Sequence, residues 1–101
     1  MESPILSMSN ISEQSVFDTL KYQVEVDKNG MRRYYNKAGQ LHRDGGPAII
    51  NERRDKYWYQ YNRLHRTDGP AIEFADGRKW WYLNDRPLTE AEFNQGVKQH
   101  V

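Results

Sequence analysis

Along the middle of the chain, hydrophobic and polar residues alternate in short runs separated by turn residues, a pattern typical of half-buried β-strands. GPAIEF at 69–74 and KWWYLN at 79–84 are two such runs, and ADG at 75–77 forms a turn between them. Asn29-Gly30, in an earlier turn, is a pair typical of tight hairpins. The pattern predicts antiparallel hairpins with strands near 21–26, 31–36, 47–51, 56–61, 70–74 and 79–84.

One phrase of the sequence is written twice. Leu41–Arg63 and Leu64–Arg86 are identical at 11 of 23 positions, including Leu-His-Arg, Gly-Pro-Ala-Ile and a Trp-Tyr pair. An incomplete copy at 24–40 precedes them if one residue is inserted near Ala38. Self-similarity at a fixed period indicates supersecondary units that bury their apolar surface by stacking. We therefore predict a mainly β fold, an antiparallel meander of about three β-hairpin repeats with a 23-residue period.

The two ends depart from the repeat. ISEQSVFDTL, before residue 21, has the apolar spacing of a short amphipathic helix. Near the other end, Thr89 and Glu92 form a capping box, which predicts a capping helix over about 90–96 with Gly96 as its stop. We expect a single domain, 1–101, made of an N-terminal segment, the hairpin repeats and a C-terminal cap with its tail, at 1–20, 21–86 and 87–101.

Composition narrows the class of protein. Only 37% of the residues are hydrophobic and 13% are aromatic, so aromatic side chains must supply much of the buried surface. The absence of cysteine excludes disulfides and thiolate–metal sites. No apolar run is long enough to span a membrane, and the start of the sequence lacks the basic and apolar regions of a secretory signal. We expect a soluble, cytoplasmic protein that makes no membrane contact.

The charges are unevenly distributed along the chain. Acids outnumber bases in residues 1–27 and 87–101, whereas residues 28–86 hold 13 bases and seven acids. A basic middle between acidic ends could attract an anionic partner. It could equally be self-complementary, with the N-terminal segment lying on the repeats. The sequence leaves both interpretations open.

The repeated corner, Leu-His-Arg followed by Asp and Gly-Pro-Ala, has a structural interpretation. Asp44 and Asp68 can accept backbone hydrogen bonds, and the histidine and arginine can bind carbonyls or pair with the aspartate. A binding role is the alternative for His42, Arg43, His65 and Arg66. The two histidines are expected to lie about 10 Å apart, two strand spacings, and no HxH or HxxxH spacing occurs. We therefore predict no catalytic residues, no metal and no cofactor.

Aromatic residues occupy both faces of the predicted strands. Alternation places Tyr57, Tyr59 and Tyr61 on one face and Trp58 on the other. One face must be the core, and the other is either covered by a terminal segment or exposed as a binding strip. The predicted turn at 52–55 lacks glycine and carries two arginines. Beyond the corners, the candidate binding residues are therefore Tyr57, Trp58, Tyr59, Trp80, Trp81, Tyr82, Arg53 and Arg54.

The tandem phrase W-Y-x-x-x-x-L-H-R-x-D-G-P-A, carried by residues 57–71 with weaker matches on either side, resembles short repeats of bacteriophage and large-DNA-virus proteins. The period and hairpin pattern are also similar to MORN repeats, non-catalytic β-hairpin arrays, although the glycine-rich MORN signature is absent. The resemblance implies shape and a viral source, with the host cytoplasm as location. It implies no residue-specific activity.

Two functions follow as expectations. The first is a small non-enzymatic binding protein that docks on a host protein, in its viral version as an inhibitor of a host enzyme or defence system. The alternative is a nucleic-acid-binding module in which aromatic residues stack on bases and neighbouring cations contact phosphates. These cations are Arg32, Arg33, Arg53, Arg54, Lys56, Arg78 and Lys79. A pI near 8.0 is low for a strong phosphate binder. Free sheet edges and a thin core leave homodimerisation open.

Overall fold

A computed structural model describes residues 20–99 of the chain, with side chains described for 20–96. The described part is mainly β, as predicted. Its strands are followed by one C-terminal helix, in the order β1 (Gln23–Val26), β2 (Arg32–Tyr35), β3 (Ile49–Ile50), β4 (Lys56–Tyr57), β5 (Tyr59–Gln60), β6 (Arg63–Leu64), β7 (Ile72–Glu73), β8 (Lys79–Leu83), β9 (Arg86–Leu88) and α3 (Glu90–Gln99).

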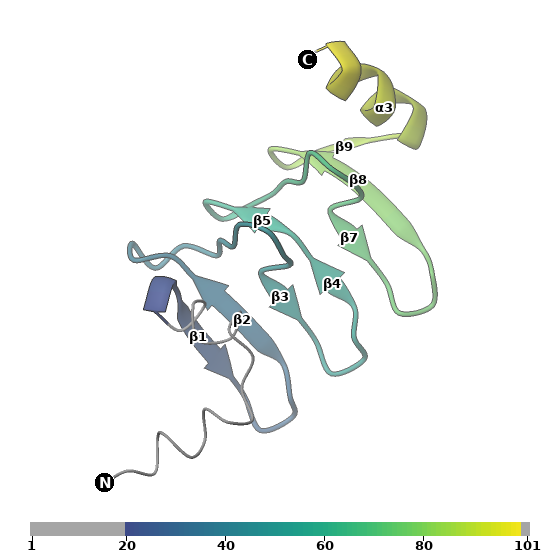
Figure 1. Cartoon of the computed structure of the whole chain (residues 1–101). Coiled ribbons are helices and arrows are strands. Elements are labelled where there is room, and N and C mark those ends of the chain that lie inside the picture. The colour runs from purple at the N-terminus through teal and green to yellow at the C-terminus, as the bar shows by residue number, and fades with distance from the viewer. Residues whose placement is uncertain (1–19, 100–101) are drawn as a thin grey trace, which may run out of the picture.

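The main sheet is an antiparallel meander with the strand order β1-β2-β3-β4-β7-β8-β9, and β5 and β6 form a separate short ladder. Figure 1 shows the hairpins β1–β2, β3–β4 and β7–β8 side by side, like steps along the molecule. The three hairpins close in the same register, at Val26↔Arg32, Ile50↔Lys56 and Glu73↔Lys79. Equivalent positions of successive hairpins therefore lie in rows across the sheet.

Each hairpin ends in a five-residue tip with the same hydrogen bonds. In the third tip, Phe74 N–H donates to the Arg78 carbonyl and Gly77 N–H to the Phe74 carbonyl. The fourth tip residue has positive φ, at +91° for Gly30, +73° for Arg54 and +99° for Gly77. The expected two-residue turn at Asn29-Gly30 is therefore wrong, because that geometry requires two successive residues of positive φ and only Gly30 has it.

The two-residue geometry occurs instead at the other end of the hairpins. Tyr61-Asn62 and Asn84-Asp85 have positive φ at both positions, so they form the turns of β5–β6 and β8–β9. Tyr61 thus lies in a turn, 61% exposed, and not on the predicted strand. The strand predicted over 56–61 is interrupted at Trp58, whose backbone bonds to Ala71 on one side and His65 on the other.

The sheet has two chemically different faces, because directly opposed residues of antiparallel strands point to the same side. One row joins Ile49, Tyr57, Ile72 and Trp80, and we call this side the apolar face; beyond Ile49 the row continues into the ion pair of Arg33 and Glu25. The adjacent row, on the opposite side, defines the basic face and runs along Arg32, Ile50, Lys56, Glu73 and Lys79.

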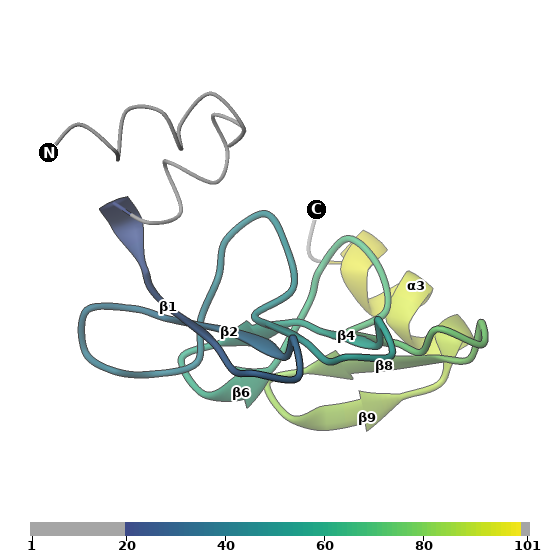
Figure 2. The ribbon, with the colours of Figure 1, turned by 90° about the horizontal axis from the view of Figure 1, so that it is seen from below.

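The loops that follow β2 and β6, residues 41–48 and 64–71, are called the corner loops. Each passes over the basic face, as the contact of Arg66 with Glu73 shows. Figure 2 shows these loops arching to one side of the sheet and α3 lying on that same side. The side chains that are least exposed gather at the corners and the cap, and include Tyr34, His42, Ala48, Ala71 and Phe93.

The C-terminal helix begins as the sequence predicts. Thr89 N–H donates to Glu92 Oε1, and Glu92 N–H donates to Thr89 Oγ1, which is the reciprocal pattern of a capping box. The helix contacts β8 and β9 and buries Phe93. Gly96 does not stop it, because α3 continues to Gln99. The predicted N-terminal helical segment falls on residues 1–20, nearly all outside the described part.

Candidate functional site

Each corner loop folds an arginine back onto an aromatic ring of the preceding hairpin. The Arg43 guanidinium carbon lies 3.9 Å from the centre of the Tyr34 ring, and that of Arg66 lies 3.9 Å from the Trp58 ring. The same guanidinium groups donate to the carbonyls of Pro47 and Pro70. Cation–π contact on a partly desolvated ring stabilises both loops. The two arginines therefore hold the repeats together.

A glycine on the far side makes room for each arginine. A methyl group added at Gly46 would stand 3.0 Å from Arg43 Nη1, and one added at Gly69 would stand 2.9 Å from Arg66 Cζ. The glycine of each Gly-Pro-Ala motif is thus explained by close approach and not by its backbone conformation, because neither residue has positive φ. Arginine, ring and glycine form a three-layer stack in both corners.

The corner histidines lock the next two-residue turn in place. Tyr61 N–H donates to His42 Nδ1 at 3.1 Å, and Asn84 N–H donates to His65 Nδ1 at 3.0 Å. Because Nδ1 is an acceptor, each neutral ring carries its proton on Nε2. In the first corner this Nε2 lies 3.2 Å from Asp44 Oδ1. The Nδ1 atoms are occupied by backbone donors, so they are poor candidates for proton transfer to a substrate.

Two more hydrogen bonds complete each lock. Leu41 N–H donates to Asn62 Oδ1 and Asn62 N–H to the Leu41 carbonyl. Leu64 and Asp85 repeat the pair one repeat later. Asn62 and Asp85 thus accept hydrogen bonds from backbone N–H groups, the role that was predicted for the corner aspartates.

The corner aspartates bind side chains and differ from each other. Asp44 accepts from Lys21 Nζ and from Gln60 Nε2, whereas Asp68 accepts from Arg66 Nε. Partial desolvation raises the pKa of Asp44, but hydrogen bonds from Lys21 and Gln60 and the nearby positive charges outweigh it, so the pKa lies below its ordinary value.

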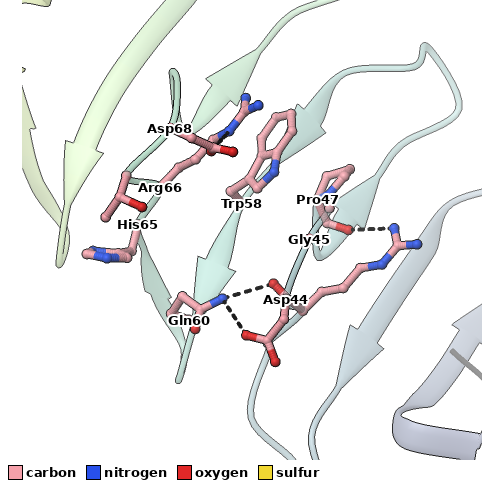
Figure 3. A pocket seen from close by; sticks show the side chains of 11 residues that line it. Asp44, Gly45, Pro47, Trp58, Gln60, His65, Arg66 and Asp68 are labelled. Atoms are coloured by element: carbon pink, nitrogen blue, oxygen red, sulfur yellow. Dashed lines mark hydrogen bonds and ion pairs between the residues drawn. The ribbon is translucent and has the colours of Figure 1, made fainter. Parts of the chain in front are cut away.

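A groove of about 480 Å³ lies between the two corner loops. Its wall includes Trp58, Gln60, Thr67 and both corner arginines and aspartates, and Figure 3 shows the Arg66 side chain alongside the Trp58 ring. The charged groups of the wall already bind other groups of the chain: Arg66, for example, contacts Asp68, Glu73 and the Pro70 carbonyl. The groove is therefore explained by the packing of successive repeats and offers no set of converging free groups.

The apolar face provides a different kind of surface. Ile72 is 8% exposed, Ile49 and Tyr57 are half-buried, and Trp80, at the end of the row, is 50% exposed. Tyr57 meets Phe74 edge to face, with ring centres 6.3 Å apart. The row is a continuous apolar strip, on the side opposite the corner loops.

The structure brings the candidate binding residues to four separate places. Tyr57 and Trp80 lie on the apolar face, and Tyr59 and Tyr82, two residues further along the same strands, are half-buried opposite Leu64 and Pro87. Trp58 lies on the basic face beneath Arg66, and Trp81, the neighbour of Trp80 on β8, points to that face by alternation. The remaining candidates are at the corners (His42, Arg43, His65, Arg66) and the second tip (Arg53, Arg54).

The two rows themselves were not predicted from the sequence, although Arg32, Lys56 and Lys79 were among the cations expected to contact phosphates in the alternative function. Ile49 and Ile72 belong to the apolar strip, and Arg32, Lys56 and Lys79 form the exposed cations of the basic face. One signal was available: these three cations hold the same position in successive hairpins.

Within residues 20–99, no group of three His, Asp or Glu side chains is placed to hold a metal ion. In the same range, no helix is long and apolar enough to cross a membrane. Comparisons with protein-family models, with curated proteins and with solved structures found no match to this chain.

Proposed function

We propose that this protein is a small non-enzymatic binding module that docks on another protein through its apolar face. The observation that carries the proposal is the strip of Ile49, Tyr57, Ile72 and Trp80, which crosses adjacent strands and ends in a half-exposed tryptophan. Large aromatic side chains at the edge of an apolar patch are typical anchors of protein interfaces. The strip lies on the side opposite the corner loops and α3, so none of those elements covers it.

The alternative, nucleic-acid binding, has less support from the arrangement of side chains. Single-stranded nucleic acid is held by exposed aromatic rings and cations that act on one surface. Here the half-exposed Trp80 lies on one face, whereas the exposed Arg32, Lys56 and Lys79 lie on the other. The basic-face rings of Tyr34 and Trp58 are already stacked against arginines of the chain.

The resemblance to viral tandem-repeat proteins suggests which protein is bound. An inhibitor of a host enzyme or defence system would act in the host cytoplasm by occupying a surface, and a rigid repeat sheet suits that task. The apolar strip of about three repeats would form one interface, and α3 would cover the last hairpin at one end of the sheet. Homodimerisation through the same strip is the competing use of this surface.

The test is affinity capture with cross-linking in host lysate, comparing the wild-type chain with Trp80→Glu. We expect a specific partner to be lost with Trp80→Glu and kept with Val26→Glu, which places the same charge at an exposed apolar residue of the other face. Equal capture by both variants would contradict docking through the strip. Sedimentation of the purified protein shows whether the chain dimerises, and so distinguishes homodimerisation from binding to a different protein.

The nucleic-acid alternative has its own measurement. Titration with oligonucleotide at low and high salt should leave tryptophan fluorescence unchanged if the proposal holds. Salt-sensitive quenching would instead favour phosphate contacts, whose affinity falls steeply with ionic strength.

A further inference from the structure

The acidic side chains of the described region are largely used inside the molecule. Asp27 caps its own tip, Asp55 binds Ala75 N–H of the next tip, and Asp85 binds Leu64 N–H. Others are held by cations, as Glu73 is by Arg66 and Asp76 by Arg78. Residues 28–86 also hold 13 bases and seven acids, so the hairpins carry a net positive charge.

Three of these cations form a ladder on the basic face. Arg32, Lys56 and Lys79 are exposed, occupy equivalent positions of the three hairpins, and make no ion pair with any residue in the described part of the chain. Consecutive members are separated by two strand spacings, about 10 Å. The positions between them are Ile50 and Glu73, the latter already paired with Arg66 at 3.1 Å.

The first step of the ladder continues into a shallow groove at the tips. This groove, about 400 Å³, lies between the first two hairpins and is lined by Arg32 and Arg54 together with Ile50 and Glu52. Arg54 makes no ion pair within residues 20–99 either. The basic face thus presents cations at regular intervals. Between them lie Ile50, which is apolar, and Glu73, whose charge is neutralised by Arg66.

We propose that the basic face binds an acidic stretch of polypeptide, with one carboxylate opposite each cation of the ladder. This goes beyond the proposed function by adding a second binding surface. The apolar face would contact an apolar region of a partner, and the basic face would contact an acidic segment. An extended chain in the polyproline II conformation advances about 9 Å in three residues, close to the ladder step. Such a chain can place neutral residues opposite Ile50 and Glu73.

A nucleic-acid strand fits the same surface less well. Its backbone carries a charge at every unit, so phosphates would also face Glu73 and Glu52. The rings of Tyr34 and Trp58 on the basic face are already stacked against Arg43 and Arg66, so they are not available to stack on a base. Charge complementarity therefore selects a spaced acidic peptide.

The experiment measures fluorescence anisotropy of a fluorescein-labelled peptide with repeating Glu-Pro-Pro on the full chain. Neutralising the ladder in Arg32→Gln/Lys56→Gln/Lys79→Gln should weaken binding about tenfold, the sum of three exposed ion pairs. The matched control, Lys37→Gln/Arg63→Gln/Arg86→Gln, removes the same charge from exposed residues at the corner end and should change affinity less than about twofold. Thermal unfolding by circular dichroism verifies that both variants are folded.

Two results would overturn the proposal. One is an equal loss in the ladder and control variants, which would mean attraction by net charge alone. The other is displacement of the peptide by oligothymidylate of matched charge at a lower concentration than by unlabelled peptide, which would assign the ladder to nucleic acid. Trp80→Glu should bind the peptide normally, so failure of the apolar-face proposal and failure of this one are distinguishable.

Discussion

The two ends of each hairpin follow opposite rules. At the corner end, the repeated residues are engaged with one another: arginine lies on an aromatic ring, histidine accepts a turn amide, and glycine leaves room for the guanidinium. At the tip end, the backbone hydrogen bonds recur but the residues change from LysAsnGly to GluArgArg to AlaAspGly. The cations Arg53 and Arg54 there are exposed.

This difference shows where to look for function in a tandem repeat. Residues that the corner copies share are needed to join one unit to the next, so their identity is explained by the fold. Residues that differ, or that recur without an ion-pair partner among residues 20–99 as the ladder cations do, are available to contact another molecule. The most conspicuous motif of the sequence thus makes the contacts that join one unit to the next.

The largest predicted effect comes from removing a ring at the corner end. Tyr34→Ala should lower the free energy of unfolding by about 3–5 kcal/mol, because Tyr34 is 3% exposed and supports both Arg43 and Tyr22. Arg53→Ala at the tip should change it by less than about 0.5 kcal/mol. Urea unfolding monitored by circular dichroism measures both. A similar loss in the two variants would remove the distinction between the ends.

Substitution of the corner histidines, His42 and His65, is expected to have the second largest effect on the free energy of unfolding. His42→Ala should cost about 2 kcal/mol, because His42 is buried and the substitution leaves Tyr61 N–H without its acceptor and removes the Asp44 contact. His65→Ala should cost about 1 kcal/mol, since His65 is more exposed than His42 and the substitution removes the acceptor of Asn84 N–H. The same unfolding experiment ranks them, and a larger cost at His65 would contradict the order.

Stability should also depend on pH through the second lock. Partial burial lowers the pKa of His65 below its ordinary value of 6.5. The unfolded chain therefore takes up the proton at a higher pH than the folded one, and stability falls as the pH drops through 6.5. His65→Asn, whose oxygen can accept the Asn84 amide without titrating, should flatten this slope between neutral pH and about pH 5. An unchanged slope would assign the dependence to other groups.

The smallest effect concerns the tip that lacks glycine. Arg54 adopts φ +73°, where the other two tips have glycine, so Arg54→Gly should raise the free energy of unfolding by about 0.5–1 kcal/mol. The reciprocal control, Gly77→Ala at φ +99°, should lower it by about 1 kcal/mol. Thermal melting resolves both signs, and a loss on Arg54→Gly would show that the arginine side chain stabilises the tip.

Much of the fold could be predicted from local pattern. Alternation and turn residues gave the strands around 23–26, 32–35 and 79–83, and Thr89 with Glu92 gave the start of α3. The short strands β6 and β9 were missed, because Arg63-Leu64 and Arg86–Leu88 pair only after the two-residue turns form. Those turns contain no glycine, so they carry no strong signal in sequence.

The candidate surfaces were harder to predict. Alternation shows that Tyr57 and Trp58 point to opposite faces, but it does not show which face is covered. That depends on Arg66, eight residues beyond Trp58, folding back over its ring. Arg32, Lys56 and Lys79 were expected as phosphate contacts but not as one row, because the residue inserted in the turn at Asn36–Gln40 shifts the period of the first repeat.

The sequence by itself determined the repeat, the hairpins, the capping box and the opposite orientation of neighbouring strand residues. These depend on residues close together in the chain, whose conformational preferences are local. Only the tertiary structure decided which aromatic rings are covered and which cations remain free. That choice is made by contacts between units, where a guanidinium from one loop competes with water for a ring on the preceding hairpin.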